Sequence, residues 1–230
     1  MEVKLLSHTP EPERVVATAA RLCYASQAAE EVWAGFTPEK QQEFIGKLVN
    51  YGHYSPFEHV VFTFAVTGVS RSLSHQLVRH RIASYSQRSQ RYINEAAFAV
   101  VMPPTVDADP AARAEFNRII GQIQEGYNRL IGLGIPKEDA RYLLPNACQT
   151  QLMMTMNARS LLHFFSLRCC RRAQWEIREL AWKIRREAVK VAPLLFREAG
   201  PACLAQGKCA EGAMTCGRPY TREDVDTEDD

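Results

Sequence analysis

The spacing of apolar residues along the chain predicts alternating strands and helices. Helical spacing runs through residues 11–26 and 37–52, with Pro12 and Pro38 in the first turns. Thr37 suits the start of the second helix and Gly52 its end. β-Branched and aromatic runs predict strands at 2–8, 60–70, 96–104 and 148–158. Further helices are predicted at 70–81, 109–133, 158–170 and 173–196.

These elements predict an α+β fold, in which a single domain at residues 1–199 holds a small antiparallel sheet and several long helices. Residues 52–59 read as a polar loop and residues 136–145 as a turn that starts at a proline. The amino-acid composition changes at Gly200. The chain from there is first rich in Gly and Cys and then acidic. We therefore expect residues 200–230 to form a flexible tail.

Composition and charge narrow the function classes. The 230 residues carry 28 basic and 26 acidic side chains, a formal net charge of only +2, which disfavours a protein that coats nucleic acid. No apolar run is long enough for a membrane span, and the N-terminus lacks a signal-peptide pattern. The seven cysteines follow no disulfide framework, so we expect a reducing, cytoplasmic location.

Positive charge is concentrated in residues 79–91, RHRIASYSQRSQR, which contain no acid. Guanidinium groups and serine hydroxyls suit phosphate oxygens. The stretch lies between two predicted strands, which favours a pocket for an anion over a solvated basic turn. Its chemistry-bearing residues are Arg79, His80, Arg81, Ser84, Ser86, Arg88, Ser89 and Arg91.

A second polar group lies in residues 157–172. If this segment is helical throughout, Asn157 and Arg168 face one way, whereas Arg159 and Arg168 point in opposite directions. Either one side is surface, or the two sides serve different sites in an oligomer. Arg168 lies in an apolar stretch, and a buried arginine needs an anionic partner.

Three smaller groups have more ordinary explanations. The loop around His53, Ser55 and Glu58 matches no zinc spacing and suits either a capped loop or ligand contacts. Glu138 and Arg141 are spaced for an intrahelical ion pair. The tail cysteines lack the C-x-x-C pair that is usual in metal sites, so we expect no metal there. Loose thiols are the simpler interpretation of these residues, which are Cys203, Cys209 and Cys216.

The chain shows no Gly-rich nucleotide loop, no Walker lysine and no nucleophile elbow. If the protein is an enzyme, a cofactor supplies the chemistry. The pattern R-H-R, Ser, Ser, Arg in residues 79–91 resembles the signature of the flavin-dependent thymidylate synthases. The segments GHYSPFEH, HQLVRHR and NARSLLHFFSLR resemble the same family in the same order, and the likeness covers residues 1–197.

This resemblance implies a reaction. Such enzymes methylate dUMP to dTMP, taking the carbon from methylenetetrahydrofolate and reducing equivalents from NADPH through bound FAD, without a protein nucleophile. It also implies a homotetramer whose active sites are shared between subunits. No nucleic-acid partner and no membrane are expected.

The resemblance implies roles for individual residues as well. Arg168 is the expected catalytic residue, which polarises the pyrimidine, and His53 and Tyr92 are expected near the folate and the flavin ring. The expected FAD contacts are Ser55, Glu58, Arg79, His80, Arg81, Ser84, Asn157, Arg159 and His163. The expected nucleotide contacts are Gln76, Arg79, Gln87, Ser89, Arg91, Arg141 and Arg168.

Two positions depart from the family pattern. Gln87 stands where an acid is common, and His163 stands where an asparagine is common. Two functions of other classes remain open: an RNA-binding module that uses residues 79–91 as a basic loop, and a redox scaffold that acts through the tail cysteines.

Overall fold

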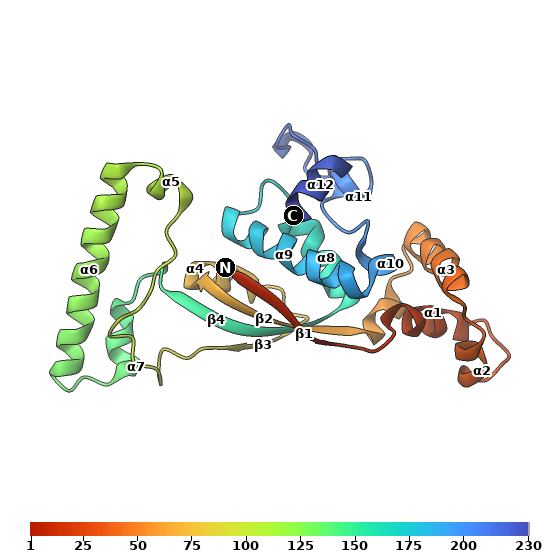
Figure 1. Ribbon diagram of the computed structural model, residues 1–230, viewed down its shortest axis with the longest axis horizontal. Coiled ribbons are helices and arrows are strands. Elements are labelled where there is room, and N and C mark those ends of the chain that lie inside the picture. The colour runs from red at the N-terminus through yellow and green to blue at the C-terminus, as the bar shows by residue number, and fades with distance from the viewer. Residues whose placement is uncertain (230) are drawn as a thin grey trace. The chain divides into compact units, whose positions relative to one another are not determined.

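The computed structural model describes residues 1–229. Four strands form one antiparallel sheet in the order β1-β2-β4-β3 (Figure 1), so the predicted α+β class with a small antiparallel sheet is confirmed. No helix of the described residues is long and apolar enough to cross a membrane. The strands are β1 (Glu2–His8), β2 (Val61–Ser70), β3 (Ser84–Gln87) and β4 (Gln149–Asn157).

The contacts of the chain group it into two compact units. Unit 1 comprises residues 1–2, 66–79 and 85–153, and unit 2 comprises residues 3–65, 80–84 and the chain from Met154 onward. Strands β2 and β4 each supply residues to both units. The predicted boundary between residues 199 and 200 stays a prediction.

In unit 1, helix α6 anchors the segment that precedes it in the sequence. Asp109, where the helix was predicted to start, caps it by accepting hydrogen bonds from two backbone N–H groups. The buried hydroxyl of Tyr127 accepts the Glu95 N–H, and the Gln124 side chain donates to the Ala96 carbonyl. The helices of unit 1 are α4 (Arg71–Leu77), α5 (Pro104–Asp107), α6 (Pro110–Gly132), α7 (Lys137–Ala140) and the 3-10 helix η2 (Arg141–Leu143).

The core of unit 2 is aromatic. Phe196 packs edge-on against both Phe62 of β2 and Phe165, with ring centroids 5.2 and 5.8 Å apart, and all three rings are fully buried. Helices α8 and α9 lie side by side (Figure 1). Replacing such a phenylalanine with alanine costs about 3–5 kcal/mol in unfolding free energy. The α-helices of unit 2 are α1 (Pro12–Leu22), α2 (Ala29–Ala34), α3 (Pro38–Tyr51), α8 (Ala158–Arg168), α9 (Trp175–Val191), α10 (Pro193–Phe196), α11 (Ala202–Ala205) and α12 (Arg222–Asp229).

Several predicted elements differ from the observed ones. The strand predicted at 96–104 is wrong: Val100 makes only an isolated bridge to Cys148, because Pro103 and Pro104 lack the N–H groups that a ladder needs. The predicted polar loop contains the 3-10 helix η1 (Ser55–His59). Proline at 193 also ends the last predicted helix early, dividing it into α9 and α10. The predicted caps Thr37 and Gly52 of α3 are confirmed.

The tail contains short helical elements, namely α11, the 3-10 helix η3 (Gly212–Met214) and α12. Tyr220 is buried, and its ring centroid lies 5.2 Å from that of Trp182 in α9. Arg171 forms an ion pair of 2.9 Å with Asp224 in α12. The tail is therefore attached to unit 2 at these side chains, while its flexibility stays a prediction.

Candidate functional site

The arginine-rich segment begins where α4 ends and continues into β3. Ser70 caps α4 by accepting the Leu73 N–H. Arg79 and Arg81 are exposed, and neither is paired with a carboxylate among the described residues. Ser84 and Ser86 alternate along β3 and are both exposed, so they lie on one face of the strand. Part of the stretch is thus a paired strand, which the sequence did not indicate.

A cavity of about 310 Å³ in unit 1 is lined by cationic and amide side chains. Arg141 was predicted as a nucleotide contact and lies on its wall, as does Arg71 of α4. Arg71 and His75 were missed, although their spacing of four residues places them on one helix face. Two guanidinium groups beside one cavity make it suited to an anion. The wall residues are Arg71, His75, Gln90, Arg141, Tyr142, Leu144, Pro145 and Asn146.

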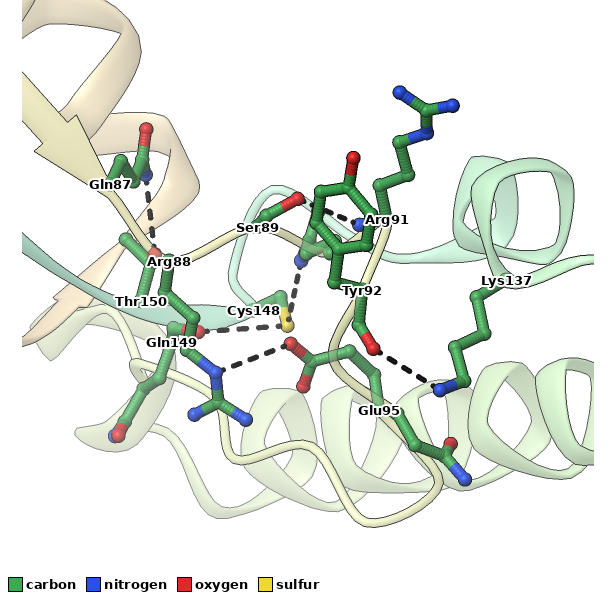
Figure 2. Close-up of polar contacts among 12 residues, drawn as sticks. Gln87, Arg88, Ser89, Arg91, Tyr92, Glu95, Lys137, Cys148, Gln149 and Thr150 are labelled. Atoms are coloured by element: carbon green, nitrogen blue, oxygen red, sulfur yellow. Dashed lines mark hydrogen bonds and ion pairs between the residues drawn. The ribbon is translucent and has the colours of Figure 1, made fainter.

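Other predicted nucleotide contacts are held by side-chain bonds within unit 1 (Figure 2). The Gln87 amide donates to the Thr150 hydroxyl at 3.2 Å. The Ser89 hydroxyl accepts the Arg91 N–H at 3.2 Å, which fixes the turn after β3. Gln87 therefore already has a partner on β4, so an acid at that position would lose a donor bond.

Glu138 pairs with a different arginine from the one that was predicted. Its carboxylate forms an ion pair of 2.5 Å with the Arg91 guanidinium. Arg141 instead donates from Nε to the Glu138 carbonyl oxygen at 3.1 Å. The expected intrahelical ion pair is wrong because the backbone after Ala140 tightens into the 3-10 helix η2, which turns Arg141 toward the carbonyl. Arg141 remains one of the residues that line the cavity.

A buried carboxylate and a buried thiol contact residues of the arginine-rich segment. Glu95 is 4% exposed, and burial raises the pKa of its carboxyl, an effect that the nearby Arg88 guanidinium, 3.8 Å away, partly offsets. Burial likewise raises the pKa of the Cys148 thiol to about 11. The Gln90 amide donates to the Cys148 sulfur at 3.4 Å, so Cys148 helps to hold Gln90 at the cavity.

Two further predicted residues lie at the surface of unit 1. Gln76 is half-buried in α4. Tyr92 is 69% exposed, and the Arg91 guanidinium carbon lies 5.4 Å from the centre of its ring. The Lys137 ammonium donates to the Tyr92 carbonyl, which ties this loop to α7 (Figure 2).

In unit 2, Arg168 is held by His80. Arg168 Nε donates to His80 Nε2 at 3.0 Å. Burial, and then the charges of Arg168 and His163, lower the pKa of His80 to about 4. His80 is therefore neutral at pH 7 and accepts this hydrogen bond, and its ring packs edge-on against Phe164 at 5.0 Å. Arg168, the residue expected to be catalytic, is thereby fixed at the end of α8.

The start of α8 carries a second set of predicted residues. Asn157 is the N-cap, and its side-chain oxygen accepts the Ser160 N–H at 2.8 Å. The prediction that Asn157 and Arg168 face one way assumed one continuous helix from residue 157. Asn157 is instead the last residue of β4, so this prediction does not apply. Arg159 forms an ion pair of 2.5 Å with Glu58 of η1, which begins at Ser55.

A larger cavity of about 900 Å³ lies in unit 2. Arg159 and His163 of α8 are on its wall, and so are Tyr51 and Tyr54, two aromatic residues that the sequence did not reveal. His53 is exposed, and its ring lies 5.9 Å from that of Tyr51. The cavity thus combines flat aromatic surface with cationic and hydrogen-bonding groups. Other wall residues are Leu162, Ser166, Leu194, Leu195, Glu198 and Gln206.

The predicted residues therefore fall into two sets. Those expected to contact FAD belong to unit 2, except Arg79. Of the two expected near the folate and the flavin ring, His53 belongs to unit 2 and Tyr92 to unit 1. Those expected to contact a nucleotide belong to unit 1, except Arg168.

Comparison with known proteins shows which family the chain belongs to. The family model described as thymidylate synthase complementing protein matches residues 4–194. The flavin-dependent thymidylate synthase of Clostridium tetani is 50% identical over 234 residues, covering 95% of this chain and 94% of that protein. The enzyme of the same name from Geobacter sulfurreducens is also 50% identical, over 220 residues, with the same coverage.

A solved structure is similar along most of the chain. The UMP/dUMP methylase PolB of Streptomyces cacaoi, solved with 5-Br dUMP bound, has a TM-score of 0.77 and 28% identity, covering 85% of this chain and 93% of that one. The family match spans the arginine-rich segment, η1 and α8, the three regions whose motifs suggested the family. The chain therefore belongs to the family of flavin-dependent thymidylate synthases.

Proposed function

We propose that this protein converts dUMP to dTMP, with methylenetetrahydrofolate as carbon donor and NADPH as reductant through bound FAD. The observation that carries the proposal is the extent of the relationship to proteins named flavin-dependent thymidylate synthase, half identical over nearly the whole chain. The similar methylase solved with a brominated dUMP supports dUMP as substrate.

The cation-lined cavity of unit 1 fits a nucleotide. Arg141 on its wall suits the phosphate, because a guanidinium offers paired donors to phosphate oxygens. Arg71 lies on the same wall and adds a second cation. Gln90 and Asn146 offer amide groups that suit the polar edge of a pyrimidine. The other residues that we propose to bind the nucleotide are Gln76, Arg79, Gln87, Ser89, Arg91 and Arg168.

The residues of unit 2 fit FAD. The cavity of about 900 Å³ is at the upper end of the size usual for cofactor sites, and Tyr51 and Tyr54 suit a flat ring. Exposed guanidinium and hydroxyl groups, such as Arg81 and Ser84, suit a diphosphate. When bound, FAD would supply hydride transfer, with NADPH as the source of reducing equivalents. The residues that would hold it are Ser55, Glu58, Arg79, His80, Arg81, Ser84, Asn157, Arg159 and His163.

Arg168 is the proposed catalytic residue. Its fixed positive charge would stabilise negative charge that develops on the pyrimidine ring in the transition state. The hydrogen bond to neutral His80 holds the guanidinium in place. The orientation is therefore set before the substrate binds.

The thiol of unit 1 is a poor nucleophile. Cys148 is the one cysteine among the residues of unit 1, it is fully buried, and its raised pKa keeps it protonated at pH 7. This supports a route in which no protein nucleophile attacks the ring. His53 and Tyr92, both exposed, are proposed to contact the folate and the flavin ring.

Flavin binding tests the proposal. The purified protein, supplied with FAD and passed through a desalting column, should retain a flavin absorption spectrum, and Arg159→Ala should weaken that retention. A colourless protein after FAD treatment would contradict the proposal. An RNA-binding module, the alternative function, predicts instead that oligonucleotides bind with strong salt dependence and that Arg168 is dispensable.

A further inference from the structure

Four of the seven cysteines line one cavity in unit 2, with a volume of about 240 Å³. One of them follows α8 and the other three come from the tail, and all are free thiols. The spacing of the tail cysteines alone does not indicate this cluster, because its fourth member comes from a distant part of the sequence. The cysteines are Cys170, Cys203, Cys209 and Cys216.

One of these thiols occupies a turn that points a backbone donor at its sulfur. The Arg218 N–H donates to Cys216 Sγ at 3.4 Å, from two residues further along the chain. Gly217, with φ of 70°, allows the turn after Cys216. Hydrogen bonds to a ligating sulfur stabilise its thiolate form and orient it.

Few buried contacts stabilise the conformation of the segment that carries Cys209 and Cys216. Every residue from 206 to 219 is exposed, and the only helical element within this range is the three-residue η3. Burial therefore contributes little to offset the conformational entropy lost when these residues are ordered. A metal ion that joins side chains across a loop contributes folding free energy directly.

The charge around the cavity is also suitable. One Zn²⁺ with four thiolates carries two net negative charges, and Arg171 and Arg218 both lie on the cavity wall. Arg171 is held there by its ion pair with Asp224 and by the Tyr220 ring, 4.0 Å from its guanidinium carbon. These contacts place positive charge beside the sulfurs.

We propose that Cys170, Cys203, Cys209 and Cys216 together bind one Zn²⁺ ion. The proposed site joins the tail to the residues that follow Arg168 at the end of α8. As the side chains lie, no group of three His, Cys, Asp or Glu residues in the described part of the chain is arranged to hold a metal ion. The thiols must therefore turn toward one another as the ion binds, each releasing its proton. Four sulfur ligands select zinc in a closed, structural site.

Metal analysis of the whole protein tests this proposal. The protein, purified under reducing conditions without chelator, should contain one zinc per chain by inductively coupled plasma mass spectrometry. Cys209→Ser/Cys216→Ser should lose the zinc, whereas Cys23→Ser, which removes an exposed thiol outside the cavity, should keep it. Chelator-stripped protein should take up one Zn²⁺ and unfold at a higher temperature.

A cobalt titration keeps the test decisive even if the double variant fails to fold. Co²⁺ added to stripped protein should give the intense visible and thiolate charge-transfer bands of a tetrahedral sulfur site. Zinc at background level, together with no such bands, overturns the proposal, as does a disulfide between cavity cysteines in protein alkylated at lysis. Zinc content is independent of dTMP formation, so failure here is distinguishable from failure of the proposed function.

Discussion

Arg168 is the residue on which the proposed chemistry depends most. Replacing it with alanine removes the cation that would stabilise charge on the pyrimidine, and the loss of one such group lowers kcat about 10²–10³-fold. The flavin spectrum should be retained, because Arg168 is not among the residues proposed to hold FAD, although its hydrogen-bond partner His80 is. Steady-state dTMP formation and the absorption spectrum measure both effects.

The matched control is Arg118→Ala, which removes an arginine from a surface ion pair on α6. It should leave kcat unchanged, since exposed pairs contribute little. Wild-type turnover by Arg168→Ala would rule out the proposed catalytic role of Arg168.

His80 gives the protein a predictable acid sensitivity. Its pKa is about 4 in the folded state and 6.5 in the unfolded state, so the unfolded state binds the proton more tightly. The stability that depends on neutral His80 is complete above pH 6.5 and falls as the pH drops toward 4. Urea unfolding at several pH values should show this decline, and His80→Gln should flatten it.

An exposed histidine serves as the comparison for His80. His59→Gln should keep the wild-type decline, since His59 lies outside the contact with Arg168. The same decline in all three proteins would show that other groups cause it.

At the scale of elements, the start of α8 combines a structural and a proposed binding role. Asn157→Ala removes the cap and should cost about 1 kcal/mol in unfolding free energy. Asn157→Ser restores a capping oxygen and should recover most of that stability, yet it lacks the amide. If the amide contacts flavin, both variants should bind FAD more weakly. Full FAD affinity in Asn157→Ser would refute the contact.

Elements with strong local signals could be predicted, whereas those that depend on neighbours could not. Thr37 was identified as a cap, and Asp109 as the start of a helix, because a capping side chain acts within three residues. Strand β3 was missed because its polar residues, such as Ser84 and Ser86, form a strand only through pairing with β4. Residues 96–104 have the composition of a strand, but their prolines prevent the ladder.

The candidate sites show the same limit. The sequence identified Arg141, because its motif resembled a known family, but it did not identify Arg71 or Tyr51. These residues reach their cavities through tertiary packing, which no local pattern encodes. The four-cysteine cavity was likewise hidden, since Cys170 is distant in sequence from the tail.

At the scale of the whole molecule, we predict a homotetramer with shared active sites. Several large apolar side chains of unit 1 are exposed, among them Leu133 at 78% and Ile119 at 42%, which suits an interface. Sedimentation velocity should give four times the 26.0 kDa mass of one chain. Co-expressed Arg141→Ala and Arg168→Ala chains should regain activity that neither variant shows alone. A monomer, or no complementation, would contradict shared sites.

The most direct measurement is the formation of dTMP from dUMP by the FAD-loaded protein, with each component omitted in turn. Product should form with NADPH and methylenetetrahydrofolate together, and omission of either one, or removal of FAD, should abolish it. The chain would not be the proposed enzyme if flavin-loaded, folded protein made no dTMP in the complete mixture.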